Sequence, residues 1–337
     1  MKKFCITLII GTLCSVSRAQ KSENIFDKAD LNAYSQVRFS SNFKDNYNFS
    51  LRRLKFWLKS APDFSENWSY KIQTTISSTH NETFFLQDVK LGYKTGVWSF
   101  DFGQFVPGYS LQRFQSDYRL PVIERAKVIN CLIPDGTLGA RDIGFQANVK
   151  TKNNIIKLSL GIFNGYGIKE FRLNNKGVMI THKTVLNIPF ENGNLQTGWS
   201  GQFRKADNLN IPKVLPDTVL FSGNDFRYNF FIKYCYKNVK IQAEYLTAFL
   251  NKEKTDGWYL LSLLSLNKKN EIVFAYEDYK DLIPETKDLP YFHIGYNYLI
   301  NSCKIKLFFD NYFQINNHLI QNYTASVQLQ IFFNQNI

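Results

Sequence analysis

Basic side chains recur at alternating positions in several stretches of this chain, and groups of this kind bind anions. Arg53 and Lys55 stand two residues apart, and Lys71 and Lys90 occupy comparable places in two later stretches. Arginine holds phosphate or carboxylate through a planar fork of donors, whereas lysine acts as a mobile point charge. One irregular segment adds four more cations, at Arg113, Arg119, Arg125 and Lys127.

Residues typical of catalysis or metal binding form no comparable group in the sequence. The four histidines are widely scattered, and no G-x-S-x-G motif is present. Adjacent carboxylates such as Glu277 and Asp278 point to opposite faces of a strand and cannot share a site. We therefore expect no catalytic residue, no metal and no bound cofactor. An enzyme embedded in the same fold is the alternative, and it would need a nucleophile and a base that converge at one rim.

Sixteen stretches of about ten residues alternate between apolar and polar side chains, and these must position the cations. Strict alternation predicts β-strands with two different faces. The expected strands are 31–40, 49–59, 68–77, 85–94, 97–106, 141–150, 155–164, 178–188, 195–205, 226–237, 239–250, 257–266, 271–280, 291–300, 304–314 and 319–333.

The connections between these strands alternate in length. Tight turns such as Lys94–Gly96 and Thr151–Asn154 follow every second strand, and mostly longer loops such as Ser41–Asn48 and Asn251–Asp256 follow the others. Short turns on one rim and long loops on the other are typical of outer-membrane barrels, as is an even number of strands. The longest connection spans about 107–140. Loops of this length are usually functional, and we expect this third long loop to fold into the lumen and constrict it.

The two faces of each strand differ in polarity. In one strand Tyr228, Phe230 and Ile232 share one face, while Arg227 and Asn229 share the other. Lipid cannot form hydrogen bonds, so a lipid-facing side must be apolar and the polar side must face water. The sequence therefore predicts an all-β protein, a transmembrane antiparallel β-barrel of about 16 strands. A soluble β-sandwich with its polar face outside is the alternative.

The N-terminus has the features of a secretory signal peptide over residues 1–19. Lys2 and Lys3 precede the short apolar run Phe4–Cys14, and Ser17 and Ala19 suit cleavage before residue 20. The barrel domain is then 20–337. Loss of three cations from the signal takes the formal charge from +13 to +10. An exported protein rarely meets nucleic acid, so we expect small anionic solutes as partners and no nucleic acid. Alternatively, the cations face anionic lipid headgroups.

The run Phe102–Pro107 with Ser110, followed by Glu124-Arg125 and the return at Gly139–Asp142, resembles the phosphate-selective porin O and P family. The early Arg52–Lys55 strand is similar to the same family. The resemblance implies a sixteen-stranded outer-membrane porin of a Gram-negative bacterium, typically a homotrimer. It also implies a basic lumen that conducts anions and a third loop that forms the constriction. Phosphate as the solute is implied by the resemblance alone.

The leading hypothesis is an outer-membrane porin, not an enzyme, that lets small anions diffuse through a basic lumen. Its other partners would be outer-membrane lipid and the barrel-assembly machinery. Arg125 and Arg141 could instead pair with carboxylates and pin the loop. A general non-selective porin and a non-conducting structural or adhesive barrel are the alternatives. The candidate pore-lining residues are Arg53, Lys55, Lys71 and Lys90 on the wall and Arg113, Arg119, Arg125 and Lys127 on the loop.

Overall fold

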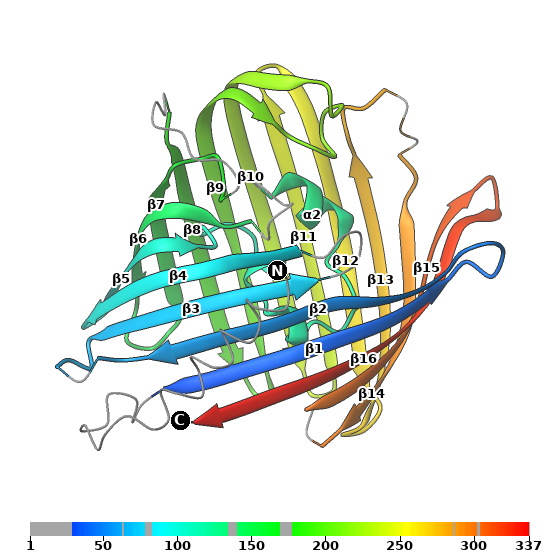
Figure 1. Cartoon of the computed structure of the whole chain (residues 1–337), viewed down its shortest axis with the longest axis horizontal. Helices are drawn as coiled ribbons and strands as arrows, with labels where there is room; N and C mark the ends of the chain where they lie inside the picture. Colours follow the sequence, from blue (N-terminus) through cyan, green and yellow to red (C-terminus); the bar gives the residue numbers. More distant parts are fainter. Residues whose placement is uncertain are drawn as a thin grey trace, which may run out of the picture.

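The chain forms a closed barrel of sixteen antiparallel strands (Figure 1). The computed structural model describes residues 29–62, 64–77, 83–133, 140–168, 177–284, 286, 288–301 and 304–336. The predicted signal peptide, residues 1–19, lies outside these residues. Strand β1 pairs with both β2 and β16, so the sheet closes on itself and the predicted fold is confirmed.

The strands follow the predicted pattern closely. Their bounds are β1 Asp30–Ser41, β2 Tyr47–Ser60, β3 Trp68–Ser77, β4 Thr83–Thr95, β5 Trp98–Phe105, β6 Asp142–Lys150, β7 Ile156–Phe163, β8 Met179–Phe190, β9 Gly193–Asn210, β10 Leu220–Tyr236, β11 Val239–Leu250, β12 Glu253–Ser265, β13 Asn270–Lys280, β14 Tyr291–Ile300, β15 Ile305–Asn316 and β16 Leu319–Asn336.

One predicted loop is wrong. The expected longer loop Asn251–Asp256 is a tight turn, because β11 ends at Leu250 and β12 already begins at Glu253. Asn251 occupies the left-handed region with φ 55°, which asparagine tolerates better than most residues, and this allows the chain to reverse within two residues. Strands β9 and β10 likewise extend further into their connecting loop than the sequence predicts.

The barrel is polar inside and apolar outside. On β10, Arg227 is 1% exposed and Asn229 is fully buried, whereas Phe230 is 55% and Ile232 46% exposed. A soluble protein would bury the aromatic residue and expose the arginine. This reversal is what a lipid-facing outer surface requires, and it excludes the polar-out β-sandwich.

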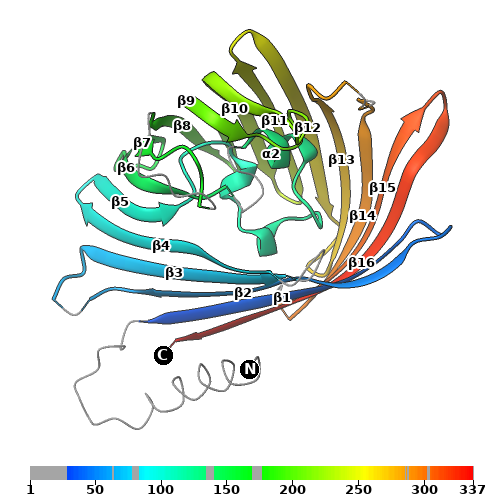
Figure 2. The same cartoon turned by 45° about the horizontal axis from the view of Figure 1, so that its top comes forward.

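The connection between β5 and β6 spans residues 106–141, and its described part contains three short helices: η2 (Gln112–Phe114), η3 (Asp117–Arg119) and α2 (Lys127–Leu132). Figure 2 shows α2 and the neighbouring chain surrounded by the strands. We call the described part of this connection, residues 106–133 and 140–141, the long loop. None of the described helices is long and apolar enough to cross a membrane.

An apolar core joins the long loop to one side of the barrel. Val128, Ile129 and Leu132 of α2 are fully buried and belong to the same cluster as side chains of β11, β12 and β13. Helix α2 contacts all three of these strands. Burying such side chains contributes roughly 1.5–3 kcal/mol each. Hydrophobic packing therefore holds the long loop on the side of β11–β13, and polar contacts position the rest of the loop. The residues of β11–β13 in the cluster are Leu246, Ala248, Leu250, Tyr259, Leu261, Leu263, Val273, Ala275 and Tyr279.

Candidate functional site

A single buried carboxylate fixes the start of the long loop. Glu244 on β11 accepts hydrogen bonds from the Ser110 hydroxyl at 2.9 Å and from the backbone N–H groups of Leu111 at 2.8 Å and Gln112 at 2.6 Å. Asn229 and Tyr259 donate to the same carboxylate at 2.9 and 2.7 Å. Five donors thus satisfy this buried carboxyl group. The entry of the loop is therefore attached to the barrel wall.

A second carboxylate, Asp117, collects cations from the wall and from the loop itself. Arg53 and Lys55 of β2 lie 3.0 and 2.7 Å from its Oδ2, and Arg125 pairs with its Oδ1. Burial would raise the pKa of Asp117, but Arg125, Arg53 and Lys55 outweigh this effect and hold it well below its usual value. Asp117 is therefore ionised at neutral pH.

A third carboxylate, Glu124, receives cations from β1 and β2. Arg52 donates to both of its oxygens, at 2.5 and 2.8 Å, and Arg38 lies 2.9 Å away. Burial would raise the pKa of Glu124, but Arg52 and Arg38 outweigh this effect and lower it. Arg52 reaches this position because the register with β1 shifts between Gln36 and Val37, so that Gln36 pairs with Arg53 and Val37 pairs with Leu51. Such a β-bulge lets two consecutive side chains point the same way.

The predicted wall lysines form a separate row. Lys59, Lys71 and Lys90 are cross-strand neighbours on β2, β3 and β4. Asp88 binds Lys71 together with Arg141, and Asp101 lies 2.7 Å from Lys90. Lys71 and Lys90 therefore lie apart from the Asp117 group.

The remaining loop candidates differ in their surroundings. Arg113 is buried, and its Nε has no hydrogen-bond partner among the described residues. Burial, together with the charges of Arg125 and Arg141, holds the pKa of Arg113 well below its usual value. Arg119 is exposed and lies over the ring of Tyr118, with its guanidinium carbon 5.3 Å from the ring centroid. The structure thus gives Arg113 and Arg119 no shared site.

Lys127 lines a cavity of about 530 Å³ between the long loop and strands β13–β16 and β1, which Arg38, Glu124 and Arg125 also border. Its ammonium lies 5.3 Å from the ring centroid of Tyr291 and 5.6 Å from that of Tyr279. Both signs of charge line this cavity, which also contains aromatic rings and hydroxyl groups. Its charged and histidine side chains are Arg38, Arg125, Lys127, Lys213, Glu124, Glu277, Asp281, Asp310 and His293.

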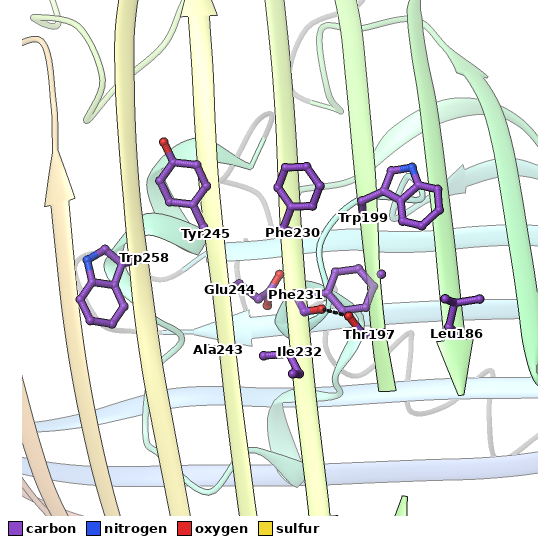
Figure 3. A pocket seen from close by; sticks show the side chains of 11 residues that line it. Leu186, Thr197, Trp199, Phe230, Phe231, Ile232, Ala243, Glu244, Tyr245 and Trp258 are labelled. Atoms are coloured by element: carbon purple, nitrogen blue, oxygen red, sulfur yellow. Dashed lines mark hydrogen bonds between the residues drawn. The ribbon is translucent and has the colours of Figure 1, made fainter. Parts of the chain in front are cut away.

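A second hollow, of about 660 Å³, lies on β8–β12 (Figure 3). Trp199, Phe230 and Trp258 line it and are among the exposed hydrophobic residues of the outer face. Glu244 also borders it but bonds the long loop on the other side of the sheet. This hollow therefore belongs to the membrane-facing surface and not to a polar path. Across the part of the chain that the structure describes, no three His, Cys, Asp or Glu side chains gather as a metal site.

Sequence reasoning missed Arg38, Arg52 and Glu244. Strict alternation sends Arg53 inward and Arg52 outward, and only the bulge brings both inside. Two adjacent arginines in a transmembrane strand were the available signal, since neither tolerates lipid. Glu244 stands between apolar neighbours, Ala243 and Tyr245, on a strand whose inner face is otherwise largely apolar toward the loop.

Solved structures share this barrel at low sequence identity. OmpF of Salmonella typhi, in complex with daunomycin, has a TM-score of 0.64 at 12% identity, covering 93% of this chain and 100% of that chain. OprB of Pseudomonas putida has a TM-score of 0.67 at 11% identity, covering 92% and 96%. The trimer form of OmpT, an outer membrane protein of Vibrio cholerae, has a TM-score of 0.59 at 10% identity, covering 90% and 99%. These likenesses concern the fold.

No curated protein sequence matches the chain significantly. The family model described as phosphate-selective porin O and P matches residues 28–260, which is more than half of the chain. The matched part contains β1–β11, the long loop and the Asp117 and Glu124 groups. The chain therefore belongs to the phosphate-selective porin O and P family and is an outer-membrane porin built on a sixteen-stranded barrel.

Proposed function

We propose that this porin prefers small anions and that the contact between the long loop and strands β1 and β2 sets the preference. The observation that carries the proposal is an excess of cations over carboxylates at this contact. Five cationic side chains pair with two carboxylates, Asp117 and Glu124, among the described residues, and the buried Arg113 lies beside them. These six basic side chains, which we call the arginine cluster, are Arg38, Arg52, Arg53, Lys55, Arg113 and Arg125.

The excess matters because the cluster is shielded from bulk water. Charges that face a narrow, partly desolvated space attract counter-ions more strongly than the same charges on an open surface. Rings of Arg and Lys favour anions in aqueous pores for this reason. Arg113 adds a buried guanidinium whose Nε has no partner among the described residues, and a passing anion would supply one.

The long loop would narrow the lumen and hold the arginine cluster in place. Its packing on β11–β13 and its ion pairs to β1 and β2 attach it on two sides. Arg125 would therefore have both roles that the sequence left open. It pins the loop through Asp117, and its charge contributes to the positive potential that attracts anions. The lysine row on β2–β4 would attract anions toward the lumen. The family and the fold indicate a channel rather than an enzyme.

Three further points belong to the proposal. Phosphate is the anion that the family name suggests, but the arginine cluster by itself fits any small oxyanion. A homotrimer is supported by the trimer form of the similar OmpT. A Gram-negative outer membrane, with export through the predicted signal peptide over 1–19, would be the setting.

The test is the zero-current potential of the purified protein in a planar bilayer under a potassium chloride gradient, with and without phosphate. We expect an anion-selective potential, reduced in the double variant Arg53→Gln with Lys55→Gln because both changes remove charge from the arginine cluster. Lys94→Gln with Lys150→Gln is the matched control, since both lysines are exposed near the short turns. Cation selectivity of the unmodified protein, or an equal loss in both double variants, would refute the arginine cluster as the filter.

A further inference from the structure

The cavity between the long loop and β13–β16, which we call the side cavity, carries a charge arrangement that a filter for simple anions does not need. Glu277 on β13 and Asp310 on β15 are both buried and line the side cavity on the strand side. A carboxylate raises the free energy of a nearby phosphate or chloride by like-charge repulsion. These two buried acids share a single histidine, His293, as their basic neighbour among the described residues, so on an anion path they favour a solute that also carries positive charge.

Asp310 is short of hydrogen-bond donors. It is 4% exposed, and its Oδ2 has no hydrogen-bond partner among the described residues. His293 Nδ1 lies 3.5 Å away, within ion-pair distance when the ring is protonated, but the two atoms make no hydrogen bond. Burying a charged oxygen without a donor is costly, so this side of the side cavity is suited to a ligand that donates.

Glu277, by contrast, is already engaged. Its Oε1 contacts His293 Nε2 at 3.2 Å, and its Oε2 accepts the backbone N–H of Lys127 at 2.5 Å. Glu277 therefore holds the long loop and the histidine in place and adds negative charge beside Asp310. Asp310 is left as the acceptor for an incoming group.

The loop side of the side cavity is richer in cations, with Arg125 and Lys127 against Glu124. Lys127 and Lys213 both line it, and neither makes an ion pair with another described residue. The Lys127 ammonium lies over Tyr291, which stacks on Tyr312 with centroids 4.4 Å apart. The side cavity thus has cationic donors on the loop and the β9–β10 connection, acids on β13 and β15, and aromatic rings beside them.

We propose that the side cavity binds small zwitterions, solutes that carry an ammonium group and a carboxylate or other oxyanion. The ammonium would donate to Asp310, beside Glu277, and the anionic end would meet Lys127 and Lys213. A volume of about 530 Å³ is within the range of small-molecule sites. This inference rests on the proposed porin function and names a solute class for its lumen.

The experiment measures block of the single-channel potassium chloride current by three solutes of matched chain length: 4-aminobutanoate, butanoate and butylammonium. We expect the zwitterion to block at lower concentration than either singly charged solute, with a dissociation constant in the millimolar range that allows release. Asp310→Asn keeps the shape of the side chain and removes its charge, and should weaken block by the zwitterion about tenfold, the equivalent of one charged hydrogen bond.

Two further variants separate a binding effect from a folding effect. Lys127→Gln alters the opposite end of the side cavity on the loop and should also weaken block by the zwitterion while leaving block by butylammonium unchanged. Asp45→Asn removes the same charge as Asp310→Asn, at the exposed β1–β2 turn, and should change nothing. A conducting, anion-selective channel that the three solutes block equally would overturn the inference and leave the porin function standing. Absence of conductance would instead refute the porin function.

Discussion

Arg52 donates two hydrogen bonds to Glu124 of the long loop, at 2.5 and 2.8 Å. Its neighbour Arg53 lies 3.0 Å from a different loop carboxylate, Asp117. Two adjacent residues of one strand thus hold the loop at two points seven residues apart. In a regular strand this is impossible, because successive side chains point to opposite faces of the sheet. The bulge opposite Gln36 and Val37 makes this possible and couples the position of the loop to the register of β1 and β2.

Removing the Asp117 charge should raise anion selectivity and loosen the loop at the same time. Asp117→Asn leaves Arg53, Lys55 and Arg125 without their shared counter-charge. Breaking a buried ion pair costs about 3–5 kcal/mol, and the low end, about 3 kcal/mol, is expected here because solvent in the lumen can relax around the cations. Zero-current potential and thermal unfolding of the purified barrel measure the two effects. Asp45→Asn controls for charge, and equal potentials in the two variants would contradict the assignment.

The Glu244 carboxylate should set the stability of the loop entry. Glu244→Gln retains one acceptor oxygen, so it cannot hold the Ser110, Leu111 and Gln112 donors together. We expect docking of the loop entry to weaken by about 2 kcal/mol, the range of a hydrogen bond to a charged group. Open-channel current noise should rise, and trypsin should cleave after Arg113 faster than in the unmodified protein. If the variant kept the current noise and the trypsin resistance of the unmodified protein, hydrophobic packing alone would be fixing the loop entry.

Packing of α2 should be the larger contribution to loop docking. Ile129 is fully buried in the core shared with β11–β13, and Ile129→Ala is expected to cost about 2–5 kcal/mol. Cys131 reports the effect, because burial raises the pKa of its thiol to about 11 and keeps it unreactive in the docked loop. Peptide-resolved alkylation at pH 8 should therefore increase in the variant. Ile156→Ala on the lipid-facing side of β7 is the control, and equal alkylation in both would refute the assignment.

Much of the barrel was predictable because the alternation of apolar and polar residues along each strand has a single physical cause: one face contacts lipid and the other contacts water. Arg227 and Phe230 fall on opposite faces in sequence, and the structure buries the first and exposes the second. Alternation alone does not say whether the apolar or the polar face forms the outer surface. That choice rested on the predicted signal peptide and the loop lengths, which are indirect evidence. The start of β12 is predicted too late, at 257 instead of Glu253, because Asn251 reverses the chain within two residues without the glycine or proline that usually marks a loop.

The site was less predictable because it depends on contacts far apart in sequence. The cationic residues Arg53, Lys55 and Arg125 were named, but their shared partner Asp117 depends on how the loop folds back. Lys127 was grouped with the other loop cations, and the structure instead places it on the side cavity. The run Tyr259–Leu264 of β12, apolar except for Ser262, was a usable signal, since a strand that is apolar on both faces must be covered on both.

The loop carboxylates also predict a specific pH dependence. Asp117 and Glu124 have pKa values below their usual range, so both stay ionised until the pH falls below the value of a free carboxyl, about 4. Their stabilisation of the docked loop is present above that pH and is lost progressively as the pH falls through the lowered values.

The zero-current potentials of the unmodified porin and of Asp117→Asn should therefore differ by an amount that depends on pH. The gap in zero-current potential between the unmodified porin and Asp117→Asn should be constant from pH 8 to about pH 5. It should shrink only once the pH falls below about 4, because protonation then removes from the unmodified protein the charge that the variant already lacks. Other groups that titrate in this range are present in both proteins, and their effects cancel in the difference. A gap that closes between pH 8 and pH 5 would show that the neighbouring cations do not hold Asp117 ionised.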